Sequence, residues 1–144
     1  MNNRSLIALL VLFLACGFQF YLGSGGVFIN FILATLIAFA FFFEWLELAV
    51  FVLFAVFVVN WEPSVSPAIV IFAAVPFAAY AFRKLFAWAP WAGVPVATIL
   101  SFAIFYLAVA PHMIVAALPS VLLDVVGSLV FGELVLAVLA RTEH

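Results

Sequence analysis

Two acidic residues, Asp124 and Glu133, interrupt the otherwise apolar stretch "SVLLDVVGSLVFGEL" (Ser120–Leu134). Ionised side chains at the depth of a lipid bilayer are costly, so each carboxylate is expected to have a partner or a function. The two acids are nine positions apart, which on an α-helix places them roughly 180° apart around the axis. They therefore belong to opposite faces of one predicted helix and are expected to have different tasks.

The Asp124 side of this predicted helix is rich in small residues, and we expect it to pack into the protein's own bundle. Small side chains let membrane helices approach one another closely, and this side carries Ser120, Gly127, Ser128 and Phe131. Glu133 is then predicted to point outward, about 10 Å from the end of the helix. We interpret it as a candidate contact with a partner protein; snorkelling toward Arg141 and protonation are the alternatives.

Three polar side chains are predicted to share one depth near the outer ends of their helices. Gln19 lies late in the first apolar segment, Asn30 lies early in the second, and Asp124 lies early in the last. We expect them to form a small intramembrane polar cluster. Hydrogen bonds between membrane helices contribute about 0.6–2 kcal/mol each, so helix packing is the favoured role and a weak ligand site is the alternative.

The remaining reactive residues do not form a catalytic, cofactor or metal pattern. The sequence has two histidines, His112 and His144, and one cysteine, Cys16. This set lacks the ligand spacing of a metal site, and neither a phosphate-binding glycine loop nor a nucleophile elbow occurs. The sequence therefore predicts a protein that is not an enzyme and that has no catalytic residues, cofactor or metal.

Composition indicates an integral membrane protein made of helices. Of the 144 residues, 72% are hydrophobic and 7% are charged, and the mean hydropathy is +1.50. Soluble domains carry about 25% charged residues, so the lipid bilayer is the expected environment. Four basic residues are too few for a nucleic-acid-binding surface. The predicted fold is all-α, a single polytopic membrane helix bundle over residues 1–144.

Six spans are predicted from the apolar segments and the turn residues between them. The run Val27–Val59 has no glycine or proline, and at about 1.5 Å per residue it would form a helix near 50 Å, too long for a hydrocarbon core of about 30 Å. We therefore place a break at Glu44-Trp45. The predicted spans are 5–22, 27–43, 46–59, 68–86, 94–110 and 120–140, with a short apolar linker before Pro119.

The basic residues set the predicted orientation. Six spans with both termini cytoplasmic place Arg4, Arg83, Lys84 and Arg141 on the cytoplasmic side, as the positive-inside rule requires. A five-span alternative, with one long second helix, would leave Arg4 on the opposite side from the other three. The tryptophans also fall at the predicted membrane boundaries, where aromatic side chains are enriched.

The segment "ELAVFVLFAVFVVNWEPSVSPAIVIFAAVPFAAYAFRKLF" (Glu47–Phe86) is similar to the MreD family of rod-shape-determining membrane proteins. The shared features are an apolar span, a polar outer loop, a second span and a terminal basic pair, in a chain with almost no extramembrane mass. This chain has Asn60 where the family tends to have aspartate, and Ile29-Asn30 where a Pro-Asp pair often opens the second span. The resemblance extends over most of the chain as a hydropathy pattern.

The resemblance implies a non-catalytic adaptor in the bacterial cytoplasmic (inner) membrane, in a complex of cell-wall elongation and cell shape. Its implied partners are MreC, RodA and the transpeptidase partner of RodA. The rival interpretation is a substrate-binding S-component of a small-molecule transporter, whose fold is similar. Such subunits dock through an Ala-x-x-x-Ala patch on the first span, whereas Ala8 and Ala15 are seven positions apart here. We therefore expect the adaptor.

Overall fold

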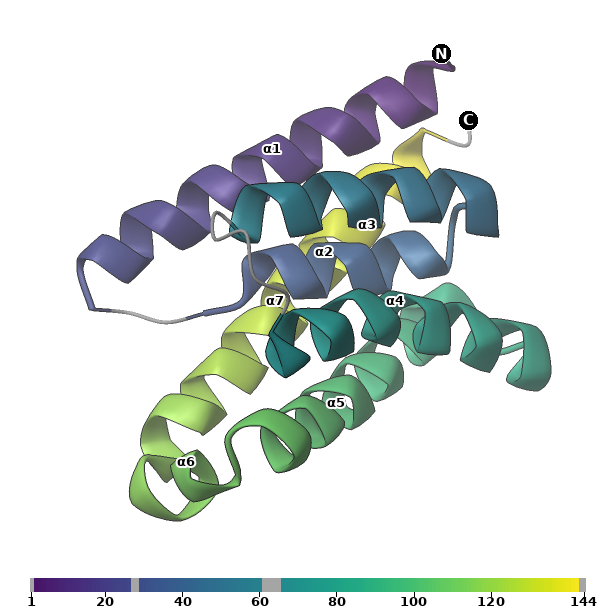
Figure 1. Cartoon of the computed structure of the whole chain (residues 1–144). Helices are drawn as coiled ribbons and strands as arrows, with labels where there is room; N and C mark the ends of the chain where they lie inside the picture. Colours follow the sequence, from purple (N-terminus) through teal and green to yellow (C-terminus); the bar gives the residue numbers. More distant parts are fainter. Residues whose placement is uncertain (1, 27–28, 61–65, 143–144) are drawn as a thin grey trace.

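The computed structural model describes residues 2–26, 29–60 and 66–142, and these residues form seven α-helices. The helices are α1 (Asn3–Ser24), α2 (Phe31–Ala40), α3 (Trp45–Val59), α4 (Pro67–Phe86), α5 (Pro90–Val109), α6 (Pro111–Ala116) and α7 (Leu118–Arg141). The predicted all-α class therefore agrees with the structure (Figure 1). Part of the loop predicted after the third span, residues 61–65, lies outside the described residues.

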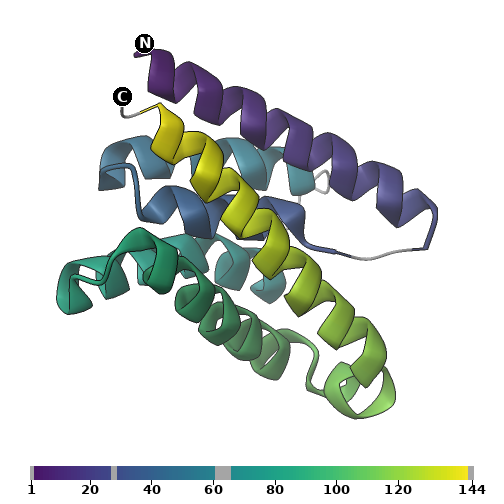
Figure 2. The ribbon, with the colours of Figure 1, turned by 180° about the vertical axis from the view of Figure 1, so that it is seen from behind.

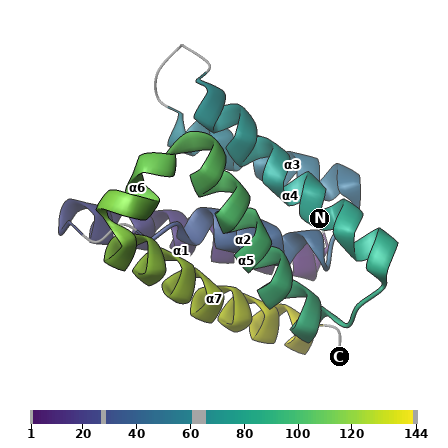
Figure 3. The same ribbon diagram turned by 90° about the horizontal axis from the view of Figure 1, so that it is seen from below.

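Proline marks the start of each helix in the second half of the chain. Helices α4 to α7 all have a proline in their first turn, where the missing backbone N–H leaves no hydrogen bond unmade. Helix α5 begins at Pro90 rather than at the predicted residue 94. The predicted linker before Pro119 contains the short helix α6, which forms the corner between α5 and α7 (Figure 3).

The chain breaks where the sequence predicted, between the second and third apolar segments. Helix α2 ends at Ala40 and α3 begins at Trp45, with Glu44 as the residue that precedes its first turn. The second segment is shorter than the predicted span 27–43, because its helix comprises only ten residues. At about 1.5 Å per residue this helix is about 15 Å long, half of a hydrocarbon core of about 30 Å.

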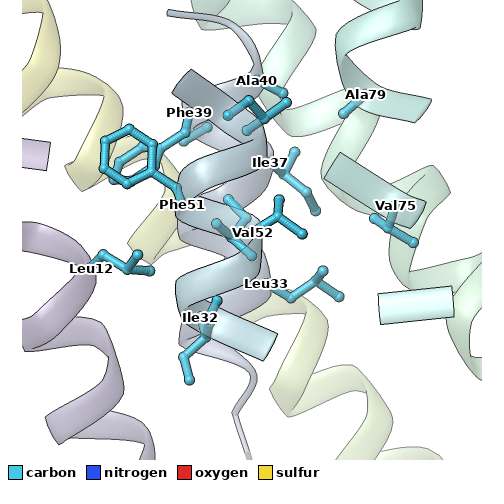
Figure 4. Packing of buried hydrophobic residues seen from close by; sticks show 14 of the residues in the cluster. Leu12, Ile32, Leu33, Ile37, Phe39, Ala40, Phe51, Val52, Val75 and Ala79 are labelled. Carbon is cyan, nitrogen blue, oxygen red and sulfur yellow. The ribbon is translucent and has the colours of Figure 1, made fainter. Parts of the chain in front are cut away.

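Helix α2 lies at the centre of the bundle. All ten of its residues are buried, and it contacts α1, α3, α4, α5 and α7. Figure 4 shows Ile37 of α2 facing Val75 and Ala79 of α4, while Leu12 approaches from α1. Figure 2, which views the bundle from the opposite side, shows α7 crossing in front of α2, and the two helices are in contact. The core of the protein is thus built around one short apolar helix.

Four helices, α1, α4, α5 and α7, are long and apolar enough to cross a membrane, so the chain is a multi-pass membrane protein. The other two apolar helices of the bundle, α2 and α3, are shorter. The first residues of α1 and the last residues of α7 lie at the same end of the bundle (Figures 1 and 2). The outward faces of the long helices expose leucine, valine and phenylalanine side chains, as expected for contact with lipid.

Candidate functional site

The N-terminal end of α2 is closed by three side chains from three parts of the chain. The backbone N–H of Asn30 donates to Asp124 Oδ1 at 2.7 Å. The N–H of Ile32 donates to Gln19 Oε1 at 3.0 Å, and the N–H of Leu33 donates to Asn30 Oδ1 at 3.1 Å. The first N–H groups of a helix have no partner within the helix, so these side chains supply the missing acceptors for α2. A negative charge at this end also interacts favourably with the helix dipole.

The structure thus brings Gln19, Asn30 and Asp124 together, and it adds two side chains to them. The Tyr106 hydroxyl donates a hydrogen bond to Asp124 Oδ2, and the Ser128 hydroxyl donates to Asp124 Oδ1 at 3.3 Å. Both carboxylate oxygens of Asp124 are therefore engaged. Sequence reasoning missed Tyr106, although its position near the end of the fifth apolar segment is a signal that it shares the depth of Asp124.

Two small cavities adjoin this capped end. One has a volume of about 210 Å³ and is lined by Gln19, Asn30, Tyr106 and Asp124 together with Ile29 and Phe105. The other has a volume of about 230 Å³ and extends toward Asn60 and Ser66 at the facing ends of α3 and α4. Gln19, Asn30 and Phe105 line both cavities. Ligand pockets usually measure about 300–1,000 Å³, so each of these is small.

The C-terminal end of α2 is closed by a cation. Arg83 Nη1 donates to the carbonyl oxygen of Ala40 at 3.3 Å and to that of Phe43 at 3.2 Å. These carbonyls have no donor within α2, and a positive charge is favourable at this end of a helix. The Arg4 guanidinium lies over the rings of Phe42 and Phe43, 5.1 and 5.2 Å from their centroids. No sequence pattern pointed to this role of Arg83.

The turn after α2 also carries an exposed polar cluster. The Tyr80 hydroxyl donates to Glu44 Oε2 at 2.8 Å, and Lys84 Nζ lies 3.8 Å from the same oxygen. The hydrogen bond from Tyr80, and secondly the positive charge of Lys84, lower the pKa of Glu44 from its ordinary value. Both partners stabilise the ionised carboxylate, and both come from the end of α4, so they link α4 to the start of α3.

Glu133 lies apart from these clusters, in an open groove between α5 and α7. The groove has a volume of about 550 Å³ and is lined by Trp91, Pro95, Leu129, Val130, Glu133 and Leu134. The structure differs here from the fully outward orientation predicted from helical geometry. Glu133 is half-buried, because the first turns of α5 cover one side of it. Its Oε1 atom is buried and has no hydrogen-bond partner among the described residues.

The inward face of α7 also differs in detail from the predicted one. The buried residues are Val121, Asp124, Ser128, Gly132, Val135 and Leu139, a stripe with the three- and four-residue spacing of one helix face. Ser120, predicted on this face, is exposed. It lies in the first turn of α7, at the corner with α6, where no helix covers it. Gly132 instead completes the stripe, with Val94 and Thr98 of α5 as its neighbours.

The residues that the structure describes include no group of three or more histidine, cysteine, aspartate or glutamate residues placed to hold a metal ion. Among the buried polar side chains, Asp124 closes the start of α2 and accepts from Ser128, whereas the hydroxyls of Thr35 and Thr98 donate to carbonyls of their own helices. No family profile, curated protein or solved structure matches the chain.

Proposed function

We propose that this protein is a non-catalytic adaptor that binds partner proteins through its transmembrane helices. The main supporting observation is the contrast between its two intramembrane acids, Asp124 and Glu133. Asp124 has both oxygens engaged within the bundle, whereas Glu133 has a buried oxygen without a donor and lies in an open groove. A carboxylate at this depth is costly unless something pairs with it, so the groove favours a binding partner.

The proposed setting is a complex of cell-wall elongation and cell shape in the bacterial cytoplasmic membrane. This part of the proposal rests on the resemblance of residues 47–86 to the MreD family, which implies MreC, RodA and the transpeptidase partner of RodA as partners. The helices of the described residues follow one another closely along the chain, so most of the surface of such a bundle is available only to lipid and to other membrane helices, which supports binding through the transmembrane helices.

The proposed topology has six crossings with both termini cytoplasmic. Three observations support it: the two helix ends near the termini lie on one side, Arg4 and Arg83 both contact residues at the end of α2, and Lys84 pairs with the adjacent Glu44. Positive charge is thereby concentrated at one end, as on a cytoplasmic side. The shortness of α2 is compatible with a crossing, because side chains satisfy both of its ends within the bundle.

Impermeant thiol labelling in whole cells tests this topology. In a Cys16→Ala background, cysteine at the exposed residue Ser66 should react from outside, and cysteine at the exposed residue Ala87 should react only after the membrane is permeabilised. The reverse pattern would invert the proposed orientation. Reaction of both residues from outside would reject the crossing by α4.

Co-purification from native membranes in mild detergent tests the function. MreC, RodA or its transpeptidase partner should be recovered with the tagged protein. An ATPase module in their place would favour the S-component-like transporter subunit, for which the two cavities beside Gln19 and Asn30 are the supporting observation. Those cavities are small, and Asp124 beside them is already used to cap α2, so the adaptor is better supported.

A further inference from the structure

The groove that contains Glu133 is apolar except for the Glu133 side chain and the indole nitrogen of Trp91. Trp91, Val130 and Leu134 are exposed on its walls, while Pro95, Leu129 and Glu133 are half-buried within it. Its volume of about 550 Å³ is large enough for one or two long side chains of a neighbouring helix. The groove is thus shaped for a side chain that inserts between α5 and α7.

The groove contains a hydrogen-bond acceptor that lacks a donor. Glu133 Oε1 is buried without a partner among the described residues. The indole of Trp91, which also lines the groove, adds an aromatic face that attracts cations. A carboxylate and an indole together favour a positively charged donor.

No basic residue of the described bundle fits this position, because no described basic side chain donates to the buried oxygen of Glu133. Glu133 lies eight residues before Arg141, about 12 Å along the helix. The walls of the groove are apolar helix faces that a neighbouring membrane helix can cover. A second membrane-spanning helix can therefore bring a cation to this position.

A second copy of this chain is also a poor occupant. A two-fold symmetric contact uses the same surface of both copies, so one centred on this groove would bring two Glu133 carboxylates close together in a medium of low dielectric. Like charges in such a medium repel strongly. A different protein with a basic side chain at matching depth avoids this repulsion.

We propose that the groove between α5 and α7 docks a transmembrane helix of another protein, which inserts a lysine or arginine side chain against Glu133 and Trp91. This inference rests on the adaptor function and specifies the chemistry of its partner. The partner's apolar side chains pack on Val130 and Leu134, and its cation pairs with the carboxylate. The pairing fixes the depth and register of the partner helix.

Energy transfer between fluorescent labels in liposomes tests the proposal with defined probes. The full chain carries the donor, and a synthetic single-span leucine/alanine peptide with one lysine two turns from its end carries the acceptor. A matched peptide has leucine in place of lysine. The lysine peptide should bind about tenfold more tightly, as expected for a polar contact between membrane helices. In Glu133→Gln, which keeps the shape of the side chain, this preference should fall to about twofold or less.

Glu47→Gln is the matched control, because Glu47 is an exposed acid of α3 outside the groove; it should keep the tenfold preference. Equal binding of both peptides to the unsubstituted protein, or an undiminished preference in Glu133→Gln, would overturn the proposal. Energy transfer between two labelled copies of this chain that disappears in Glu133→Gln would assign the groove to self-association instead. Since the probes contain no elongation protein, the result is independent of the co-purification test.

Discussion

Replacement of Asp124 by alanine should destabilise the bundle by about 2–3 kcal/mol. The substitution removes the acceptor of the Asn30 N–H and of the Tyr106 hydroxyl, and each buried donor left without a partner costs about 1–3 kcal/mol. Both donors are half-buried beside a cavity, so the lower end of that range applies to each. Loss of the negative charge at the start of α2 adds about 0.3–1 kcal/mol.

Asp124→Asn should cost much less, about 1 kcal/mol or below. The amide oxygen still accepts from the Asn30 N–H, and the amide nitrogen can donate to the Tyr106 hydroxyl oxygen, so only charge-dependent terms are lost. Unfolding in mixed detergent micelles, titrated with a denaturing detergent and followed by circular dichroism, measures both variants. Glu47→Ala is the control for loss of an exposed acid and should remain within about 1 kcal/mol of the unsubstituted protein.

Two results would refute this reasoning about Asp124. An alanine variant within about 0.5 kcal/mol of the unsubstituted protein would mean that capping of α2 contributes no stability, against the cost expected for unpaired donors. An asparagine variant as unstable as the alanine variant would mean that the negative charge, and not its acceptor geometry, stabilises the site. A folded asparagine variant that no longer supports function would instead assign Asp124 to proton or ligand binding.

Three further predictions concern the other end of α2 and the packing around it. Arg83→Met should lower the free energy of unfolding by about 1–3 kcal/mol in the same titration, because the carbonyl oxygens of Ala40 and Phe43 lose their donor. Lys84→Met removes one partner of an exposed ion pair and should lower it by about 1 kcal/mol or less. Gly93→Ala should cost about 1–3 kcal/mol, since the added carbon would lie 2.4 Å from a buried phenylalanine ring. Gly17→Ala, with open space around it, should be neutral or stabilising by about 0.5–1 kcal/mol. Glu44→Gln should lower the melting temperature at neutral pH but not in acid. The pKa of Glu44 is lowered in the folded protein, so its carboxylate stabilises the fold at pH values above the ordinary pKa of glutamate. This stabilisation is lost as the pH falls through the lowered pKa.

Each of these predictions has an opposing outcome. Equal losses in the arginine and lysine variants would mean that charge at this end matters, and not the hydrogen bonds to α2. If Gly93→Ala is as stable as Gly17→Ala, the ring of Phe41 beside Gly93 moves without cost. A difference between the glutamate-44 variant and the unsubstituted protein that persists in acid would remove ionisation as its cause.

The sequence by itself determined the class of the protein and most of its helix boundaries. Uniform apolarity with few charges excludes a soluble domain. The predicted start of α4 was within one residue of the observed one, whereas the start of α5 at Pro90 and the short helix α6 were not predicted, although a proline stands in the first turn of each. The length of the run 27–59 required a break, and the acid at Glu44 marked where it occurs. The shared depth of Gln19, Asn30 and Asp124 was also readable from their positions in the predicted segments.

Only the tertiary structure decided which helix is central and what the polar residues do. In a membrane chain the buried and the lipid-facing residues are both apolar, so no contrast between faces identifies α2 as the enclosed helix. The length of α2 depends on groups that satisfy its two ends, and these come from distant parts of the chain. Asp124 accepts a hydrogen bond from the N–H of Asn30, 94 residues away in the sequence. Arg83 donates to the carbonyl of Ala40, 43 residues away.

Glu133 shows the same limit at the protein surface. Helical geometry placed it opposite Asp124, and this relation within α7 holds for any straight helix. Whether it faces lipid or a groove depends on where α5 begins and how closely α5 approaches α7. That approach is set by Gly132 against Val94 and Thr98, a contact between residues far apart in sequence. Local periodicity orients a side chain about its own helix axis, and the packing of neighbouring helices decides what that side chain meets.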